Sequence, residues 1–162
     1  MNLRIIATGG TFDKHYDEIT GTLGFSASHL PHVIKRSRMV PPPVLEQLPF
    51  MDSLDMHAPD RQRILQACQV SPETKVIIIH GTDTMAETAA VLGPACGEKT
   101  VVLTGAMIPY EIAGSDALFN FGFACGAARS LLPGVYVAMN ATVFAWDKFC
   151  KNREAGIFIS LA

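Results

Sequence analysis

The chain contains little charge, and neither sign predominates. Of its 162 residues, 13 are lysine or arginine and 15 are aspartate or glutamate, which gives a formal net charge of −2 at pH 7. Proteins that bind nucleic acids or anionic membrane surfaces typically present clusters of basic residues. The charge balance therefore favours neither a nucleic acid nor a membrane as a partner.

Long hydrophobic runs are absent as well. No apolar stretch reaches the roughly 20 residues that a membrane-spanning helix needs. Residues 1–6 also lack the basic and apolar regions of a secretory signal. We therefore expect a cytoplasmic protein without a membrane anchor.

Cysteine is sparse and widely spaced. The chain contains no C-x-x-C pair, which argues against a zinc site or a thioredoxin-type redox site. Buried free thiols in a reducing compartment are the better interpretation and agree with a cytoplasmic location. The four cysteines are Cys68, Cys96, Cys125 and Cys150.

Signals for a bound cofactor are lacking. Neither the G-x-G-x-x-G spacing nor the P-loop spacing occurs, so neither a dinucleotide nor a nucleoside triphosphate is indicated. His29 and His32 stand three positions apart, as metal ligands on one helix face do, but no acidic or thiol residue lies near them in the sequence. We therefore expect neither a metal nor another cofactor.

What the chain does contain is a high share of apolar residues. With 49% hydrophobic residues, the 162 residues suffice to bury an ordinary core, and residues 1–162 are expected to form a single domain. Apolar runs alternate with helical patterns, which predicts an α/β fold with three layers and a mostly parallel sheet flanked by helices. The expected strands are 3–7, 44–50, 76–79, 100–103, 134–139 and 157–159, and the expected helices are 29–38, 59–69, 86–92 and 117–130.

Two further segments have weaker patterns. Residues 12–28 are polar and lack lasting periodicity, which predicts a loop of the kind that closes over a site. Residues 140–151 mix polar and apolar side chains, which predicts a short hairpin.

The most informative motif is His80–Met85. It follows an expected buried strand and precedes an expected helix, which is where ligands bind in open α/β sheets. Thr84 and Glu87 also fit the S/T-x-x-E capping box, which would give them only a structural role. A cap does not account for Thr82 and Asp83.

Other polar residues also follow expected strands. Thr11, Ser53 and Thr104 do so, as does the pair Thr82 and Asp83. Because the carboxyl ends of parallel strands meet at one edge of a sheet, these residues are expected to converge on one site.

The residue types at this edge favour acyl transfer, the hydrolysis of an amide or an ester. A threonine hydroxyl becomes a nucleophile when a nearby base accepts its proton. A desolvated lysine, for which Lys151 is the candidate, can be neutral near pH 7 and act as that base. Glycine-rich turns present backbone N–H groups that stabilise an oxyanion. The alternative is that threonines at strand ends only cap helices.

The segments A-T-G-G-T at 7–11 and H-G-T-D-T-M at 80–85 resemble the two signatures of the bacterial-type L-asparaginase and glutaminase family. The similarity continues through 105–109, through Ser115-Asp116 with Asn120, and through 139–140. It covers essentially the whole chain as the family's N-terminal domain. The short single-domain L-asparaginases are the closer resemblance.

The resemblance implies that the protein converts L-asparagine to L-aspartate and ammonia without a cofactor, with some glutaminase activity as a further expectation. Thr11 would be the nucleophile and would form an acyl-enzyme ester. Thr82, Asp83 and Lys151 would form a second catalytic group. Tyr16 would be the lid tyrosine, although Phe25 lies near where some members carry that tyrosine.

The resemblance also implies how the substrate is held. Ser53 would bind the α-carboxylate of L-asparagine, and Asp83 would bind its α-ammonium group. The remaining residues expected to line the pocket are Gly10, Asp52, Gly81 and Ala106.

The sequence departs from the family pattern in two ways. Leu54 stands where many members have a glutamine that contacts the substrate. Full-length relatives are about twice as long, in line with two domains of ordinary size. In them the C-terminal domain of a neighbouring subunit supplies an acidic residue that holds the substrate ammonium.

We expect a homodimer or homotetramer, in which a shared interface could replace that acidic contact. Phe119, Phe121 and Phe123 agree with such an interface, or they are aromatic residues of a helix core. Two other functions stay open: a non-catalytic amino-acid-binding or regulatory domain, and an amidase for another side-chain amide.

Overall fold

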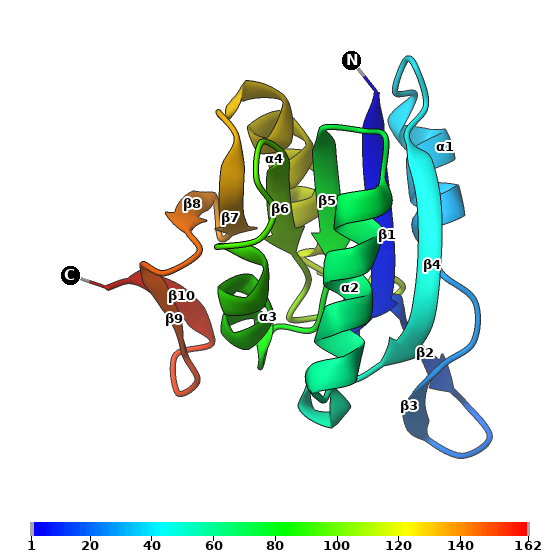
Figure 1. Cartoon of the computed structure of the whole chain (residues 1–162). Helices are drawn as coiled ribbons and strands as arrows, with labels where there is room; N and C mark the ends of the chain where they lie inside the picture. Colours follow the sequence, from blue (N-terminus) through cyan, green and yellow to red (C-terminus); the bar gives the residue numbers. More distant parts are fainter. Residues whose placement is uncertain (1, 162) are drawn as a thin grey trace.

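The structure is a computed structural model that describes residues 2–161. Six strands form its central sheet, namely β1 (Leu3–Gly9), β4 (Val44–Met51), β5 (Lys75–Ile79), β6 (Thr100–Thr104), β7 (Gly134–Met139) and β8 (Thr142–Ala145). Their order across the sheet is β4-β1-β5-β6-β7-β8 (Figure 1). All neighbours are parallel except β8, which runs antiparallel to β7. The expected mostly parallel sheet is confirmed.

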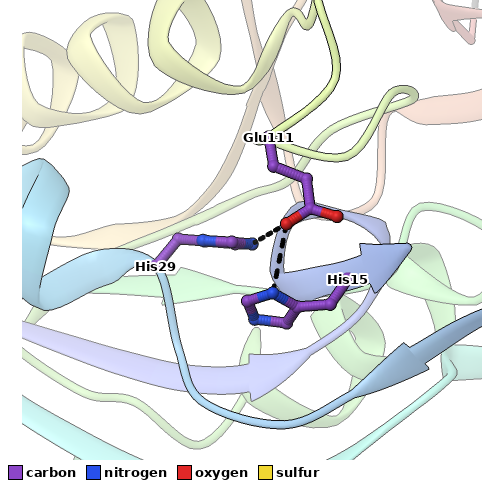
Figure 2. Close-up of side chains that lie close together, drawn as sticks. All are labelled: His15, His29 and Glu111. Carbon is purple, nitrogen blue, oxygen red and sulfur yellow. Dashed lines mark hydrogen bonds and ion pairs between the residues drawn. The ribbon is translucent and has the colours of Figure 1, made fainter. Parts of the chain in front are cut away.

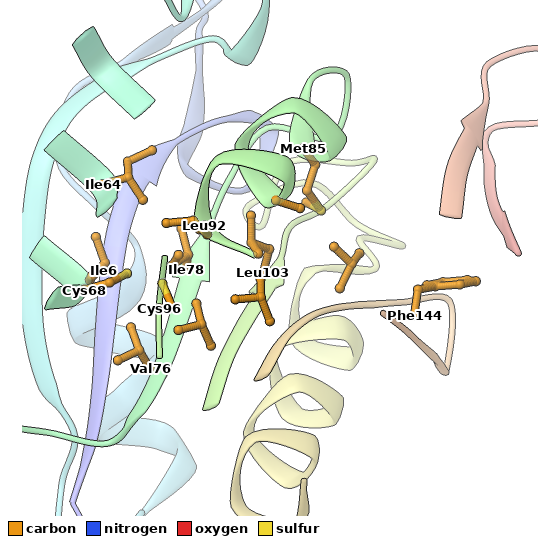
Figure 3. Packing of buried hydrophobic residues seen from close by; sticks show 14 of the residues in the cluster. Ile6, Ile64, Cys68, Val76, Ile78, Met85, Leu92, Cys96, Leu103 and Phe144 are labelled. Carbon is orange, nitrogen blue, oxygen red and sulfur yellow. The ribbon is translucent and has the colours of Figure 1, made fainter. Parts of the chain in front are cut away.

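Four helices cover the two faces of this sheet, namely α1 (Leu30–Ser37), α2 (Ala58–Val70), α3 (Met85–Leu92) and α4 (Ala117–Ser130). On one face Ile78 shares a core with Leu92 of α3 and with residues of α2 (Figure 3). On the other face Ile77 shares a core with Phe121 of α4 and with residues of α1. Burial on both faces explains why the central strands β5 and β6 are nearly continuous apolar runs. None of the helices within residues 2–161 is long and apolar enough to cross a membrane.

Residues 12–28 are not the irregular loop that their composition predicts. They contain β2 (Lys14–Asp17) and β3 (Thr22–Phe25), which pair in a separate antiparallel hairpin. The Asp17 carboxylate accepts hydrogen bonds from two backbone N–H groups of the connecting turn. Most side chains of the hairpin are exposed or half-buried. It therefore lacks the apolar alternation by which strands are recognised.

The prediction of a hairpin within residues 140–151 is also wrong. Only its first half turns back onto the sheet, as β8. The second half is β9 (Phe149–Asn152), which pairs with β10 (Ile157–Ser160) in a two-stranded sheet of its own (Figure 1). Phe149 and Phe158 are buried with their ring centroids 6.0 Å apart. This packing, which the local pattern does not reveal, selects the partner of each strand.

Close backbone contacts draw three strand ends together at the carboxyl edge of the sheet. Gly10, which follows β1 and has φ of 68°, lies against Gly81, which follows β5. A Cβ at Gly10 would stand 2.4 Å from the Gly81 nitrogen, and a Cβ at Gly81 would stand 2.6 Å from Ser53 Oγ after β4. Only residues without a side chain allow this approach. The glycines therefore decide how near the three polar segments lie.

His80 fastens the end of β5 to α3. Its Nδ1 lies 2.7 Å from the Gly81 carbonyl oxygen, and its Nε2 lies 2.8 Å from Thr88 Oγ1. Because a carbonyl oxygen only accepts, Nδ1 carries the proton, and Nε2 accepts from the threonine hydroxyl. Complete burial lowers the pKa of His80 to about 4. The ring is therefore neutral near pH 7.

The substitution Gly10→Ala should destabilise the fold, because the new Cβ overlaps the Gly81 backbone. We expect the free energy of unfolding in urea to fall by roughly 1–3 kcal/mol, to which the positive φ also contributes. The control is Gly122→Ala in α4, where a Cβ would meet no atom of residues 2–161 within 4 Å. That change should raise stability by about 0.5–1 kcal/mol. Equal effects of the two substitutions would contradict the close contact.

His80 should make the fold less stable in mild acid. Its folded pKa of about 4 lies below the ordinary value of 6.5, so between these values the unfolded chain binds more protons than the folded chain. Stability is therefore complete above about pH 6.5 and falls as the pH decreases toward 4. From pH 7.5 to pH 5 the contribution of His80 is a loss of about 2 kcal/mol. Urea unfolding at a series of pH values measures it.

The comparison of two histidine variants isolates this effect. His80→Gln removes the titrating group and should flatten the pH dependence of stability between about pH 7.5 and pH 5. His32→Gln, at an exposed position of α1, should leave it as in the wild type. A wild-type slope in His80→Gln would show that the ring is not held neutral.

Candidate active site

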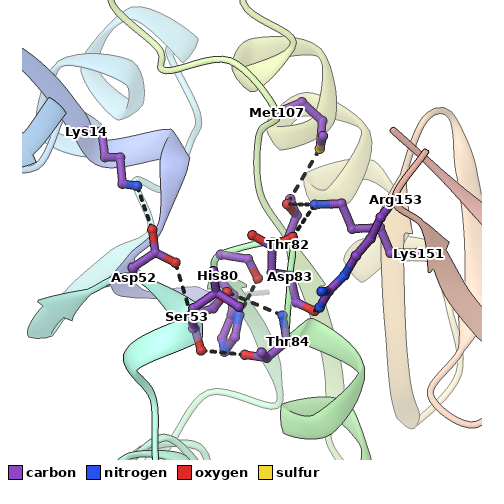
Figure 4. Close-up of polar contacts among 12 residues, drawn as sticks. Lys14, Asp52, Ser53, His80, Thr82, Asp83, Thr84, Met107, Lys151 and Arg153 are labelled. Carbon is purple, nitrogen blue, oxygen red and sulfur yellow. Dashed lines mark hydrogen bonds and ion pairs between the residues drawn. The ribbon is translucent and has the colours of Figure 1, made fainter. Parts of the chain in front are cut away.

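Polar side chains meet at the carboxyl edge of the sheet, although they come from distant parts of the sequence (Figure 4). Ser53 follows β4, and Thr82 and Asp83 follow β5. Lys151 of β9 and Arg153 just after it reach toward Asp83 from the separate hairpin. The structure thus brings several of the expected site residues together.

Lys151 is held between a hydroxyl and a carboxylate. Its Nζ donates to Thr82 Oγ1 and to Asp83 Oδ1, both at 2.7 Å. The lysine side chain is 11% exposed and the Asp83 side chain 34% exposed. Thr82 Oγ1 in turn donates to Met107 Sδ at 3.5 Å. An ammonium group, a hydroxyl and a carboxylate therefore form one partly desolvated unit, within which a proton moves only a short distance.

Thr84 does not cap α3 with its side chain. Its hydroxyl donates to the Ser53 carbonyl oxygen at 2.7 Å, and its backbone N–H donates to Ser53 Oγ at 3.3 Å. Glu87 pairs instead with Arg61 of α2 at 2.6 Å. The capping-box interpretation is therefore wrong. Thr84 joins the segment after β5 to the segment after β4.

Asp52, expected in the substrate pocket, also holds the neighbouring hairpin. Its carboxylate accepts hydrogen bonds from Lys14 Nζ at 2.6 Å and from the Leu54 N–H at 3.1 Å. Burial acts to raise the pKa of Asp52, but these hydrogen bonds outweigh burial and lower it below its ordinary value. Asp52 is therefore ionised and connects β2 to the end of β4. Leu54 itself is exposed.

Two polar residues that we did not assign to the site position the end of β6. The Asp116 carboxylate accepts the Met107 N–H at 3.0 Å. Asn120 donates to the Gly105 carbonyl oxygen at 3.0 Å and accepts from the Asn140 N–H at 3.3 Å. Asn120 thus connects the ends of β6 and β7. The available signal was their place in the motifs that resemble the asparaginase family.

The remaining expected residues lie along the same edge. Thr11 is half-buried directly after Gly10, so the contact of Gly10 with Gly81 sets its segment beside that of Thr82. Ala106 is buried after β6. Tyr16 lies on β2 with its side chain exposed. The roles of Thr11 and Tyr16 stay predictions.

His29 does not form a metal-type pair with His32. It faces His15 and Glu111 instead, and one ligand-type atom of each of these three residues lies within 4.8 Å of the others (Figure 2). His32 is exposed on α1 and is not part of this group. The acidic neighbour that the sequence near His29 lacks is supplied by a distant segment.

At the carboxyl edge, the arrangement provides what acyl transfer requires. The contact of Lys151 with Thr82 and Asp83 provides groups that exchange protons. The glycine turns provide backbone N–H groups that can stabilise a developing oxyanion. The nearby hydroxyl of Thr11 is a candidate nucleophile.

Comparisons with known proteins agree with this geometry. The family model described as "Asparaginase, N-terminal" matches residues 2–156. L-asparaginase 1 of Escherichia coli (strain K12) is 30% identical over 161 residues, which cover 94% of this chain and 44% of that protein. Glutaminase-asparaginase of Acinetobacter glutaminasificans is 32% identical over 176 residues, which cover 98% of this chain and 53% of that protein.

Solved structures give the same result. The thermostable L-asparaginase from Thermococcus kodakarensis superposes with a TM-score of 0.86 and 28% sequence identity, over 99% of this chain and 51% of that one. The chain thus spans about half the length of the relatives that it matches. Since the family model matches nearly all of its residues and the fold is shared as well, the chain belongs to the asparaginase family, whose N-terminal domain it matches.

Proposed function

We propose that the protein hydrolyses the side-chain amide of L-asparagine to L-aspartate and ammonia. The observation that carries this proposal is the position of Lys151 Nζ, 2.7 Å from both Thr82 Oγ1 and Asp83 Oδ1. A threonine nucleophile needs a partner that exchanges protons with it. A lysine in contact with a hydroxyl and a carboxylate, at the edge where Thr11 lies, provides one.

The reaction has two halves. In the first, Thr11 Oγ attacks the amide carbon, its proton passes to the amide nitrogen, the C–N bond breaks, and ammonia leaves behind a threonine ester. In the second, water attacks the ester carbon, Thr11 regains its proton, and L-aspartate is released. Thr82, Asp83 and Lys151 exchange the protons, and backbone N–H groups of the glycine turns stabilise each oxyanion.

Substrate recognition follows from charge. Ser53 binds the α-carboxylate, and Asp83 binds the α-ammonium group. Gly10 and Gly81 line the pocket through their backbone, because neighbouring atoms fill the space that a side chain would take. Asp52 lines the edge of the substrate pocket and does not bind a charged group of the substrate, because its carboxylate is already paired with Lys14. The other expected contacts are Ala106 in the pocket and Tyr16 as its lid.

Glutamine is longer than asparagine by one methylene group. One methylene group typically changes the ratio of kcat/KM between two substrates by roughly 10–200-fold. We therefore expect glutaminase activity to be the weaker of the two.

We further infer a homodimer or homotetramer. Phe121 is buried and Phe123 packs on the same core, so these two phenylalanines are explained by the fold itself. Phe119 is 59% exposed on α4, next to exposed Leu118. A partner copy that covers this surface could also supply an acidic contact for the substrate ammonium. A cytoplasmic location belongs to the same proposal, since all four cysteines are free.

Thr11→Ala should lower ammonia release from L-asparagine by roughly 10³-fold or more, because no other group forms the acyl-enzyme ester. Release is measured on L-asparagine, L-glutamine and D-asparagine. The control Thr142→Ala changes an exposed threonine of β8 and should keep wild-type rates. Thr11→Ala should still bind L-aspartate in calorimetry.

Three outcomes of this assay would decide against the proposal. Undiminished release by Thr11→Ala would remove Thr11 as the nucleophile. Folded wild-type protein that binds L-aspartate but releases no ammonia would favour the amino-acid-binding domain, and release only from other side-chain amides would favour a different amidase.

Lys151→Met should lower kcat/KM by roughly 10²–10⁴-fold, because it removes the ammonium group and keeps the apolar stem. The matched control is Lys148→Met, an exposed lysine of the same segment, which should retain activity. Because Asp83 remains 34% exposed, the variant should fold, which circular dichroism checks. Equal losses in both variants would indicate a general effect of charge and would contradict a role for Lys151.

A further inference from the structure

Two histidines and a glutamate converge outside the group formed by Lys151, Thr82 and Asp83. His15 lies on β2, His29 precedes α1, and Glu111 belongs to the connection between β6 and α4 (Figure 2). His15 Nδ1 lies 3.1 Å and His29 Nε2 lies 3.8 Å from the same atom, Glu111 Oε2. Three separate segments of the chain therefore each bring one ligand atom to within 4.8 Å of the other two.

One of the two nitrogens, His15 Nδ1, lies within hydrogen-bond distance of Glu111 Oε2. His15 Nε2 lies 2.6 Å from the Ala27 carbonyl oxygen. Because a carbonyl oxygen only accepts, Nε2 carries the proton, and in neutral His15 the lone pair of Nδ1 faces Glu111. His29 Nε2 is buried and has no hydrogen-bond partner among residues 2–161. Its side chain is only 12% exposed. An imidazole nitrogen that faces a carboxylate is satisfied either by a proton on the ring or by a metal ion that both groups bind.

Two of the three separations are close to those in a tetrahedral transition-metal site, and the third is at most 4.8 Å. With metal–ligand bonds of about 2.0–2.1 Å, the ligand atoms of a tetrahedral zinc site lie about 3.4 Å apart. The distances of 3.1 Å and 3.8 Å to Glu111 Oε2 lie on either side of this value. Two imidazoles and one carboxylate are a common ligand set for zinc, with a fourth position for water. Magnesium and calcium prefer oxygen ligands throughout.

Neighbouring groups already orient the three ligands. The Ala27 carbonyl oxygen holds the His15 ring, and the Tyr16 N–H donates to the second oxygen of Glu111 at 2.5 Å. Buried Asp13 accepts the backbone N–H of His29 at 2.9 Å. Outer contacts of this kind fix ring and carboxylate orientations in metal sites and raise affinity.

We propose that His15, His29 and Glu111 bind a divalent transition-metal ion, for which Zn²⁺ is the best match. The ion would fasten the β2–β3 hairpin to the β6–α4 connection and to the start of α1. Tyr16, the proposed lid residue, directly follows His15 and would be held with it. The ion takes no part in the proposed amide hydrolysis, so its binding is tested without any measurement of activity.

Protein stripped of metal with a chelator and dialysed is titrated with ZnCl₂ in a calorimeter. We expect one equivalent to bind, and Mg²⁺ at the same concentration not to bind. At free Zn²⁺ about 100-fold above Kd, the Tm should rise by about 5–10 °C. Amide hydrogen exchange across residues 14–25 should slow, because the hairpin is fastened. Co²⁺ in place of Zn²⁺ should give the visible absorption of tetrahedral coordination.

Variants locate the site. His15→Gln and Glu111→Gln should each weaken Zn²⁺ binding by about 100-fold or more. Mutation of a residue that only contacts a metal ligand already costs about 10–100-fold in affinity. The two side chains are 30% and 31% exposed, so the variants should fold. Their Tm, measured in the presence of chelator, checks this. His32→Gln, a control at an exposed histidine next to the cluster, should bind like the wild type.

Three results would overturn the proposal. The first is the absence of saturable Zn²⁺ binding by the wild type. The second is wild-type affinity in both His15→Gln and Glu111→Gln. The third is loss of binding in His32→Gln with retention in His15→Gln, which would place the ion at the pair of His29 and His32.

Discussion

The approach of Gly10 to Gly81, and of Gly81 to Ser53, is the constraint on which the rest of the site depends. A Cβ at Gly10 would stand 2.4 Å from the Gly81 nitrogen, and one at Gly81 would stand 2.6 Å from Ser53 Oγ. Three strand ends therefore meet at backbone distance. Short side chains next to the glycines, such as those of Thr11 and Thr82, suffice to build a site there. Among these three strand ends no long side chain has to act as a bridge, and the long side chain of Lys151 is added from the β9–β10 hairpin.

The unit formed by Lys151, Thr82 and Asp83 is completed by Lys151, which belongs to the β9–β10 hairpin outside the main sheet. A comparison of free-energy contributions shows which interactions hold this hairpin in place. In a partly desolvated ion pair such as that of Lys151 and Asp83, the loss of solvation offsets most of the attraction, so its net contribution is too small to fix a hairpin. Burial of a phenylalanine contributes about 1.5–3 kcal/mol. Phe149 and Phe158 of the β9–β10 hairpin are both buried in the core beside α3. The aromatic packing therefore fixes the hairpin, and the polar contacts set only the final position of the ammonium group.

The parts of the structure that the sequence predicted are those with strong local signals. The β5 strand is recognisable because burial on both faces demands an unbroken apolar run. The β2–β3 hairpin is not, because its side chains are mostly exposed or half-buried. The meeting of Lys151 with Thr82, 69 residues away, was predicted only through the family resemblance, since spacing alone does not reveal a tertiary contact. The local sequence around Thr84 fits a capping box, but in the fold its hydroxyl donates to the Ser53 carbonyl oxygen and does not cap the helix. The convergence of His15 and Glu111 had no local signal.

The β2–β3 hairpin lies between two polar contacts, and this decides how its position is controlled. Successive residues of a strand point to opposite faces. Lys14 accordingly reaches Asp52 after β4, while His15 reaches Glu111 of the β6–α4 connection. An isolated two-stranded hairpin is only marginally stable in water, and this one is mostly exposed or half-buried. Polar contacts and the packing of Phe25 on Phe50 of β4 therefore both hold the hairpin in place. Ionic strength, which screens exposed charges over about 8–10 Å, should then weaken the polar contacts of the hairpin more than it lowers the stability of the sheet.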